Sequence, residues 1–404
     1  MTLTSPNSEL LAPPAFSKPL AEAVLSAVRH VLPPDSAGVA LHEPEFRGHE
    51  WEYVKECLDT GWVSSVGKFV DRFEVMLIEY TGAKHAIATA NGTAALHICL
   101  LLAGVKPGDE VLIPSLTFIA TANVVNYCRA TPHFVDCEER TLGVDAAKLD
   151  AYLRDTAKVH DGVCINRRTN AVIRALMPMH AFGMPADIDA LVDLCDRWKL
   201  ALVEDAAESL GSYYMGRHTG TFGRLAGLSF NGNKIVTTGG GGAILTNDPD
   251  LARQAKHLTT TARVPHRWSF IHDAIGFNYR LPNLNAALGC AQLERIPDFI
   301  VRKRSLHARY VQAMRGVEGI SVVTERAECQ SNYWLVTLLL DRPDVTMRDA
   351  ILQTLNDAGL MARPAWTLMH LLPIYSDCPR MSLTEVELLA ARIINVPSSP
   401  KLAD

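Results

Sequence analysis

A single lysine stands between an apolar segment and four consecutive glycines in Ser229-Phe230-Asn231-Gly232-Asn233-Lys234-Ile235-Val236-Thr237-Thr238-Gly239-Gly240-Gly241-Gly242. The apolar residues 225–230 predict a strand, so Lys234 lies in the loop just past its carboxyl end, where open α/β sheets bind ligands. The glycines that follow allow the backbone to approach a bound group closely. A solvated lysine beside a flexible turn is the alternative interpretation of this segment alone.

A second predicted strand ends in acidic residues. The apolar residues 200–203 lead directly into Glu204 and Asp205. Asp205 and Lys234 facing one crevice predict a pyridoxal phosphate site, in which the lysine holds the cofactor as an imine and the carboxylate keeps the pyridine nitrogen protonated. A plain salt bridge between the two side chains is the alternative, and it explains neither the glycines nor Ser229.

Composition describes an ordinary globular, enzyme-sized chain. The 404 residues are 48% hydrophobic and 21% charged, with a net charge of −5 and no lysine or arginine run, which argues against a nucleic-acid partner. No apolar stretch reaches the roughly 18 residues needed to span a bilayer, and the N-terminus lacks a leader pattern, so we expect no membrane association and a cytoplasmic location. The nine cysteines include no Cys-x-x-Cys pair, so we expect reduced core cysteines and no metal site.

From residue 86 onward, strand and helix patterns alternate. We predict strands at residues 86–89, 110–114, 133–136, 170–179, 200–204, 225–230 and 243–246, with helices at 92–102, 118–128, 145–154, 187–198 and 249–260. Alternation of this kind predicts parallel strands with right-handed crossovers. The predicted fold class is therefore α/β. We divide the chain into an N-terminal extension (1–40, with a surface helix at 20–31), a large domain (41–275) and a small C-terminal α/β domain (276–404).

Several residues near strand ends are weaker candidates for the site. Asn91 is a plausible helix N-cap, and the backbone N–H groups from Gly92 to Ala94 suit a phosphate, although capped helices without ligands are common. Phe118 follows a strand end, where an aromatic ring can stack on a planar cofactor, but core packing is more frequent. We interpret His180 as a hydrogen-bonded structural histidine and Trp62 as a packed tryptophan in a connection.

The C-terminal part begins after a long polar and aromatic connection at residues 261–277. Such a length inside a compact protein indicates function or contact with a partner subunit, and Arg263, Arg267 and Trp268 lie in it. We expect Asn283 to cap a helix ending at residue 293. Two further helices, strands at 320–323 and 333–340, and helices at 346–358 and 383–394 complete the unit.

Several motifs in this order resemble the DegT-type (StrS-like) nucleotide-sugar aminotransferases, which are fold-type I pyridoxal-phosphate enzymes. The resemblance runs from about residue 42 to 397. It is closest to the branch that aminates 4-keto sugars for legionaminic-acid-like nonulosonic acids. The motifs are Trp62-Val63-Ser64-Ser65-Val66-Gly67-Lys68, Asn91-Gly92-Thr93-Ala94-Ala95-Leu96, Glu204-Asp205-Ala206-Ala207-Glu208, residues 229–242, and Gly276-Phe277-Asn278-Tyr279-Arg280.

The resemblance assigns roles by position. It makes Lys234 the imine-forming lysine and general base, and Asp205 the partner of the pyridine nitrogen. It gives further cofactor contacts to Phe118 (ring stacking), Thr93, the amide of Ala94 and Ser229 (phosphate), and Glu208 (ring hydroxyl). Asn278 would reach the phosphate of the neighbouring subunit, which implies a homodimer with shared active sites. Gly240 departs from many relatives, which carry an acidic residue there, so sugar contacts are not transferred from them.

The implied reaction moves an amino group, with glutamate as the expected donor, to C4 of a UDP- or GDP-linked 2-acetamido-4-keto-6-deoxy sugar. Three alternatives stay open. The chain is another nucleotide-sugar 3- or 4-aminotransferase, for example of the perosamine type; or a dehydratase-like relative, against which the lysine argues; or a cofactor-binding sensor without turnover. The nucleotide, the sugar substituents and the stereochemistry of the amine are not fixed by the sequence.

Overall fold

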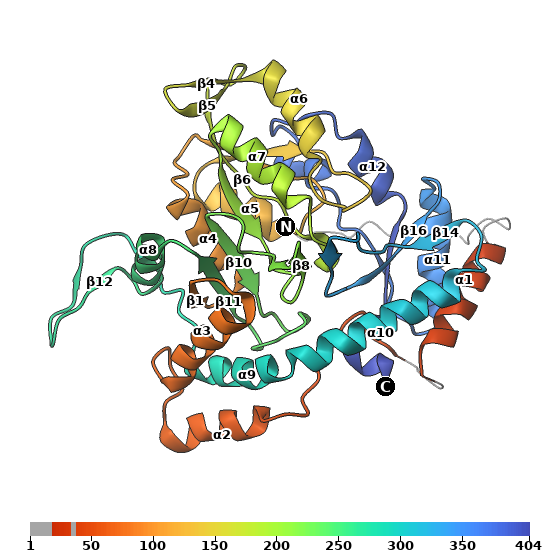
Figure 1. Cartoon of the computed structure of the whole chain (residues 1–404), viewed down its shortest axis with the longest axis horizontal. Coiled ribbons are helices and arrows are strands. Elements are labelled where there is room, and N and C mark those ends of the chain that lie inside the picture. The colour runs from red at the N-terminus through yellow and green to blue at the C-terminus, as the bar shows by residue number, and fades with distance from the viewer. Residues whose placement is uncertain (1–17, 34–37) are drawn as a thin grey trace, which may run out of the picture.

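A nine-stranded mixed sheet occupies the centre of the computed structural model, which describes residues 18–33 and 38–404 (Figure 1). Its main order is β1-β11-β10-β7-β6-β2-β3, with β5 beside β6 and β4 beside β5. Strands β10, β7, β6, β2 and β3 are parallel, whereas β11 is antiparallel to β1 and β10. The strands are β1 (His85–Thr89), β2 (Glu110–Pro114), β3 (Thr131–Val135), β4 (Ala157–His160), β5 (Val163–Asn166), β6 (Val172–Leu176), β7 (Ala201–Asp205), β10 (Leu225–Ser229) and β11 (Gly242–Thr246).

The parallel strands β2 and β7 are buried along their whole length. Such strands need cover on both faces, which helical crossovers provide. Helix α4 packs on β10 and β11, and α7 packs on β7. The helices are α1 (Lys18–Val31), α2 (Glu50–Thr60), α3 (Lys68–Thr81), α4 (Gly92–Leu102), α5 (Ile119–Tyr127), α6 (Ala146–Thr156), α7 (Ile188–Trp198), α8 (Pro249–Thr259), α9 (Asn283–Glu294), α10 (Ile296–Met314), α11 (Val345–Asp357) and α12 (Thr384–Ala390), with 3₁₀ turns η1 (Ala181–Gly183), η2 (Met369–Leu371), η3 (Pro373–Tyr375) and η4 (Pro400–Ala403).

Smaller sheets complete the C-terminal part. A four-stranded sheet has the order β14-β16-β18-β17, and a three-stranded sheet, β15-β8-β9, joins the two halves of the chain. Figure 1 shows α10 running along the lower side of the molecule toward α1 and α11. These strands are β8 (Tyr213–Tyr214), β9 (Arg217–His218), β14 (Ile320–Val322), β15 (Cys329–Gln330), β16 (Val336–Leu340), β17 (Arg363–Pro364) and β18 (Ile393–Val396).

Three predictions about C-terminal elements are wrong. One continuous helix, α10, replaces the two further helices predicted before residue 320. The helix predicted at 383–394 ends at Ala390, because Ile393 and Ile394 pair with β16 as part of β18. Asn283 is the first residue of α9 and does not cap that helix. Its Oδ1 instead accepts from the amide of Phe69 in the first turn of α3, and its Nδ2 donates to the carbonyl of Trp62 in the loop between α2 and α3.

The connection at residues 261–277 contains a hairpin that the sequence pattern did not reveal. Strands β12 (Arg263–Val264) and β13 (Ile271–His272) pair antiparallel, and Figure 1 shows the hairpin projecting from the body of the molecule. Apolar side chains on the hairpin are exposed to solvent: Trp268 is 72% exposed and Phe270 is 73% exposed. An isolated two-stranded ribbon is only marginally stable in water.

The packing crosses the predicted domain boundaries. Part of the N-terminal extension (1–17 and 34–37) lies outside the described residues, but α1 is a helix as predicted. Its buried face, which includes Val24 and Val28, packs against α10 and α11 of the C-terminal unit. Conversely, α9 packs against α2 and α3. The division into domains at residues 40 and 275 stays a prediction.

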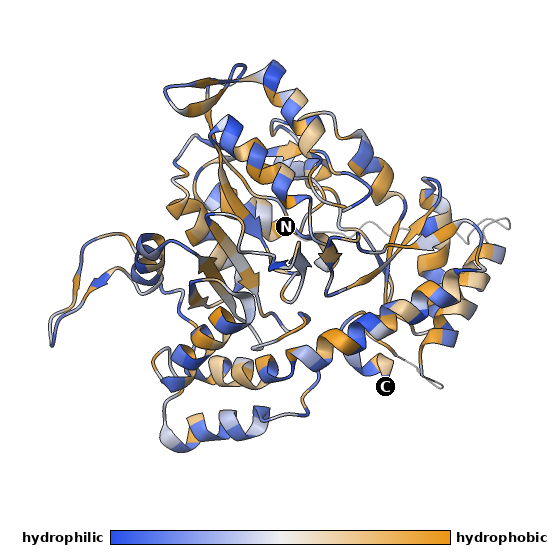
Figure 2. Ribbon diagram, in the orientation of Figure 1, coloured by the Kyte–Doolittle hydropathy of each residue, from blue (hydrophilic) through white to orange (hydrophobic). Residues whose placement is uncertain are grey.

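Apolar side chains concentrate inside the sheet, while the outer helices alternate hydrophobic and hydrophilic positions (Figure 2). All nine cysteines are free thiols, and only Cys378 is more than slightly exposed. Among the described residues, none of the helices is both long enough and apolar enough to cross a membrane.

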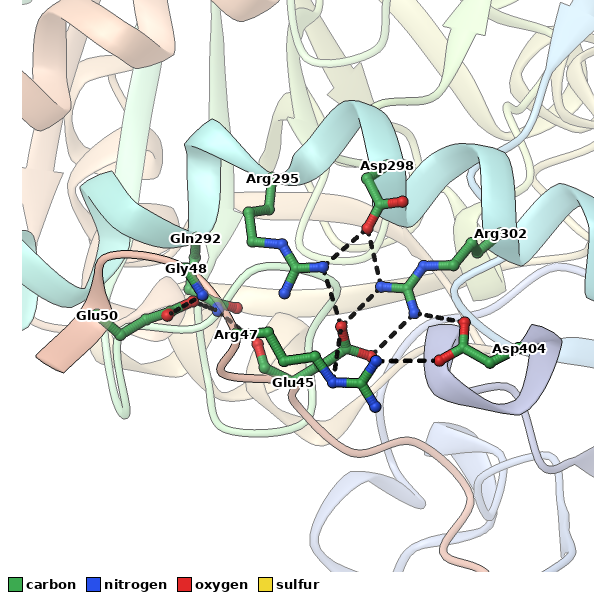
Figure 3. Close-up of polar contacts among 9 residues, drawn as sticks. All are labelled: Glu45, Arg47, Gly48, Glu50, Gln292, Arg295, Asp298, Arg302 and Asp404. Atoms are coloured by element: carbon green, nitrogen blue, oxygen red, sulfur yellow. Dashed lines mark hydrogen bonds and ion pairs between the residues drawn. The ribbon is translucent and has the colours of Figure 1, made fainter.

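A buried carboxylate ties the segment before α2 to α10. Glu45 accepts hydrogen bonds from Arg302 at 2.8 and 3.0 Å and from Arg295 at 3.0 Å, while Asp298 binds both guanidinium groups (Figure 3). Asp404 adds a further ion pair to Arg302. Burial raises the pKa of Glu45, but the Arg302 and Arg295 guanidinium groups more than offset this and lower it overall.

We predict that Glu45→Gln lowers the free energy of unfolding by about 2–4 kcal/mol, because it removes the buried carboxylate that both guanidinium groups share and leaves them only the half-exposed Asp298 in common. Since the folded-state pKa of Glu45 is lowered, its contribution to stability is fully present above the ordinary glutamate pKa of 4.5 and is lost as pH falls through the lower folded-state pKa. Urea denaturation at pH 7 and pH 4 measures both effects. Arg47→Ala is the control, because its 61% exposed side chain makes a surface pair worth about 1 kcal/mol or less. Equal losses of unfolding free energy in Glu45→Gln and Arg47→Ala would contradict the role of Glu45 as a buried counter-ion.

Candidate active site

A cavity of about 310 Å³ opens at the carboxyl ends of β2, β7 and β10. This is the edge at which the sequence predicted the ligand site. A larger hollow of about 600 Å³, near Tyr80 and Tyr213, contains none of the predicted site residues. The residues lining the 310 Å³ cavity are Asn91, Gly92, Thr93, Leu96, Phe118, Ala120, Thr121, Met179, Asp205, Ala207, Glu208, Ser229, Asn231, Asn233, Lys234, Trp334 and Trp366.

Asp205 is the last residue of β7 and is 2% exposed. One carboxylate oxygen accepts a hydrogen bond from Thr121 Oγ1 at 2.7 Å, and the other accepts one from the Ala207 amide at 3.2 Å. Burial raises the pKa of Asp205, and these two hydrogen bonds offset only part of that effect. A carboxylate fixed in this way at the cavity wall can form a strong, charge-assisted bond to a cationic ring nitrogen.

Lys234 lies in the loop after β10, where its amide donates to the Asn231 carbonyl at 2.9 Å. Its Nζ is 3.0 Å from Glu208 Oε1 and 3.8 Å from the centroid of the Trp334 ring. The side chain is 14% exposed, so the amine faces the cavity with little contact with bulk solvent. An amine in this position can reach a carbonyl carbon bound between Asp205 and Phe118.

Glu208 is the second buried carboxylate of the site. Its Oε2 accepts a hydrogen bond from the Phe182 amide at 2.9 Å, and its Oε1 faces Lys234. Burial raises the pKa of Glu208 to about 7, although the Lys234 ammonium acts in the opposite direction. Near neutral pH the group is therefore able both to accept and to donate a hydrogen bond.

The N-terminus of α4 faces the same cavity. Asn91 caps the helix, and its Oδ1 accepts from the Ala94 amide at 2.8 Å. The first-turn N–H groups of Gly92 and Thr93 have no acceptors within the helix, so they can bind an anion. Ser229, at the end of β10, lies across from Gly92. The predicted phosphate position thus has Thr93 and Ser229 beside it, while the Ala94 amide already has a partner.

Aromatic side chains form the opposite wall. Phe118 precedes α5 and is 50% exposed, with its ring edge-on to Trp366 at a centroid distance of 6.4 Å. Trp366 in turn stacks on Phe182 at 5.0 Å. The sequence did not identify Trp334 and Trp366 as site residues, because each lies at least 100 positions beyond Lys234 and neither belongs to a recognisable motif.

The structure places the remaining candidates outside this cavity. Asn278 is exposed and bridges to Thr260 at the base of the β12–β13 hairpin. The prediction of a packed Trp62 is wrong, because its side chain is 58% exposed beside a separate surface hollow. His180 is a structural histidine, as predicted: it is fully buried, its Nε2 lies 3.0 Å from Glu204, and its Nδ1 accepts from the Ala186 amide.

The cavity suits a phosphorylated, aromatic aldehyde such as pyridoxal phosphate. It combines an amine, a buried carboxylate, an exposed aromatic ring and a helix N-terminus within one concave space. These are the groups needed to hold an aldehyde carbon, a ring nitrogen, a ring face and a phosphate, respectively. Among the described residues, no cluster of histidine, cysteine or acidic side chains could hold a metal ion. The fold and the site thus define a fold-type I enzyme dependent on pyridoxal phosphate.

Comparison with known proteins agrees with this class. The chain belongs to the DegT/DnrJ/EryC1/StrS aminotransferase family, which it matches over residues 44–404. It is 38% identical over 372 residues to the GDP-perosamine synthase of Caulobacter vibrioides, covering 92% of this chain and 95% of that protein. It is also 38% identical over 337 residues to EpsN of Bacillus subtilis, whose name describes a pyridoxal phosphate-dependent aminotransferase, covering 83% and 84% of the two chains. The crystal structure of the aminotransferase TlmJ from Streptoalloteichus hindustanus superposes with a TM-score of 0.81 at 28% identity, covering 91% and 95%.

These findings confirm the predicted fold class, the aminotransferase activity and the pyridoxal phosphate cofactor. They support the broad family rather than the legionaminic branch that the motifs suggested, because the Caulobacter vibrioides relative is a GDP-perosamine synthase. The roles of individual residues stay predictions.

We predict that Glu208→Gln changes how the stability of the cofactor-free protein depends on pH. Because the folded-state pKa of Glu208 is raised to about 7 from 4.5, folded wild-type protein retains a proton that the unfolded chain has lost. Between these pH values Glu208 therefore lowers the free energy of unfolding as pH rises, by about 2–4 kcal/mol in total. Glutamine can still accept from Phe182 but does not titrate.

Urea denaturation of wild type and Glu208→Gln from pH 4.5 to 7.5 measures this difference. The variant should gain stability relative to wild type as pH rises. A relative loss over the same range would mean that the ion pair with Lys234 outweighs burial.

Proposed function

We propose that the protein transfers an amino group from glutamate to C4 of a GDP-linked 4-keto-6-deoxy sugar, as a perosamine-type aminotransferase. The observation that carries the proposal is the cavity in which Lys234, Asp205 and Phe118 meet the α4 N-terminus. Similarity to a GDP-perosamine synthase along almost the whole chain supports the choice of sugar. The 2-acetamido sugars of legionaminic-type pathways remain the second candidate, on the resemblance of residues 62–68 and of the glycine run.

Each side of the cavity would hold one part of the cofactor. Lys234 supplies the amine that joins the aldehyde carbon, and Asp205 pairs with the ring nitrogen. Phe118 covers the ring face, and Glu208 lies near the ring hydroxyl. The phosphate would lie at the start of α4, against Thr93 and Ser229, and would share the Ala94 amide with Asn91 Oδ1. Bound pyridoxal phosphate supplies an electron-withdrawing ring and carries the amino group between donor and acceptor.

The side chains then move protons at defined atoms. Lys234 Nζ takes the proton from the α-carbon of the donor and returns it to the carbon that carried the aldehyde, so the lysine serves as tether and as general base. Asp205 stays buried and negatively charged, which stabilises the protonated ring nitrogen throughout. Glu208, 3.0 Å from Lys234, orients the amine. The aromatic wall limits water around these groups.

The choice of acceptor is tested by measuring glutamate-dependent amination of a panel of nucleotide-linked keto sugars, the free keto sugar and simple α-keto acids. We expect efficient turnover of the GDP-linked 4-keto-6-deoxy sugar, weaker turnover of UDP- and GDP-linked 2-acetamido forms, and little with simple α-keto acids. A nucleotide contributes remote binding energy that orients the ketone, so the free keto sugar should be a far poorer substrate. Preference for a 2-acetamido sugar would restore the legionaminic assignment. Efficient turnover of an α-keto acid with no activity on any nucleotide sugar would contradict the proposed acceptor, but not the fold or the cofactor.

We expect Lys234→Ala to lower kcat by at least about 100-fold, the lower range of a general acid–base contribution, while leaving the fold intact. Borohydride reduction of the loaded wild-type enzyme followed by peptide mapping should place the pyridoxyl group on Lys234. Lys256→Ala is the matched control, because that lysine forms a surface pair with Glu74. A pyridoxyl group on any other lysine would remove Lys234 from its role.

Asp205→Asn should lower the rate severely, since an amide cannot stabilise a cationic ring.

We also propose a homodimer with shared active sites, located in the cytoplasm. Asn278 is exposed at the base of the projecting hairpin and does not line the cavity of its own chain. The exposed Trp268 and Phe270 on that hairpin suit burial against a second copy. Asn278 would then contact the cofactor phosphate in the neighbouring subunit.

Mixing inactive Lys234→Ala subunits with inactive Asn278→Ala subunits tests this arrangement. After denaturation and refolding at equal amounts, half of the dimers are hybrids with one intact site of two, so about a quarter of wild-type activity should return. Verified hybrids without any activity would show that both residues serve the same subunit.

A further inference from the structure

Trp334 lies directly against the amine of Lys234. The Nζ atom is 3.8 Å from the centroid of the Trp334 ring and 3.0 Å from Glu208 Oε1. Trp334 is 4% exposed and lines the same cavity, although it comes from the segment just before β16. The indole and the carboxylate together define one position for the amine.

The indole is held from several directions. Its Nε1–H donates to the Asn233 carbonyl at 2.8 Å, one residue before the lysine that it contacts. The Trp334 amide donates to Asn332 Oδ1 at 2.7 Å, and its carbonyl accepts from the buried amine of Lys303 at 3.1 Å. Asn332 also donates to the carbonyls of Glu208 and Leu210. The ring is therefore fixed relative to both Lys234 and Glu208.

An aromatic face attracts an ammonium group and has little attraction for a neutral amine. This preference is worth about 0.5–2 kcal/mol, and tryptophan is the most effective ring. Lys234 needs both forms in the proposed reaction, since its neutral amine takes one proton from the donor α-carbon and its ammonium later returns the same proton. The Trp334 ring, 3.8 Å from Nζ, therefore stabilises the ammonium form of Lys234.

We propose that Trp334 is a positioning residue that holds the Lys234 ammonium, together with Glu208, during the part of the cycle in which the lysine is not joined to the cofactor. The inference rests on the proposed role of Lys234 and extends it to a residue 100 positions away. The other titratable groups that act electrostatically on this amine are Asp205 and the buried His42.

The first test uses the cofactor-free full chain and needs no turnover. Trace acetylation with acetic anhydride, quantified by mass mapping of the Lys234 peptide, reports the fraction of neutral amine. The measured quantity is the acetylation rate at about pH 7.5 divided by that at about pH 10.5, which cancels changes in access. Loss of the ammonium–ring contact in Trp334→Leu should raise this ratio about 2- to 10-fold.

Two variants make the result specific. Trp334→Phe keeps a ring face but loses the indole N–H, so its ratio should stay within about twofold of wild type. Trp366→Leu removes a second tryptophan from the same cavity wall that has no ring contact with Lys234, and its ratio should be unchanged. Equal ratios in Trp334→Leu and wild type, or an equal rise in Trp366→Leu, would overturn the proposal.

The second test measures a single turnover of the loaded enzyme with glutamate, using the absorbance of the bound cofactor as the readout. We expect the rate to fall about 3- to 30-fold in Trp334→Leu and less than about threefold in Trp334→Phe. If wild type fails to react with glutamate, the proposed function fails while the acetylation ratio still decides the role of Trp334. An unchanged single-turnover rate in Trp334→Leu would show that the ring does not act in the reaction.

Discussion

The pair of adjacent carboxylates at the end of β7 is the constraint on which the site depends. Glu204 and Asp205 point to opposite faces of the sheet, and both are almost fully buried. Glu204 accepts hydrogen bonds from the amides of Gly220, Phe222 and Gly223 and contacts His180. Burial raises the pKa of Glu204, yet the His180 contact and these amides lower it overall. A buried ionised group with this many donors fixes the loops around it.

The consequence of that anchoring appears at the neighbouring strand ends. His180 follows β6, and the 220–223 loop leads into β10, so Glu204 joins the segment after β6 to the start of β10. The His180 amide also donates to the Asp205 carbonyl. Asp205 is thereby left on the opposite face of β7, where Thr121 and the Ala207 amide bind it. One residue secures the scaffold, and the next is free to face the cavity.

The sequence could predict those parts of the site that follow strand ends. Lys234, Asp205 and the α4 N-terminus each come directly after an apolar run, and parallel strands bring their carboxyl ends to one edge. Trp334 and Trp366 could not be predicted, because they reach the cavity through the packing of the C-terminal unit onto the sheet. The same limit explains the errors at Asn283 and at residues 383–394, where a tertiary partner, not the local pattern, determined the structure.

The glycine run after Lys234 shows the difference between structural and variable positions. A Cβ on Gly242 would lie 2.5 Å from the Asn91 backbone, so close approach of β11 to the start of α4 requires glycine there. Gly239 has a φ of 80°, a conformation that other residues adopt with strain. At Gly240 neither constraint applies, since a Cβ would meet nothing within 4 Å. The backbone therefore tolerates a side chain at residue 240, the position where the resembling enzymes often carry an acid. Glycine at this position leaves residue 240 uncharged, and the space around it does not require a glycine.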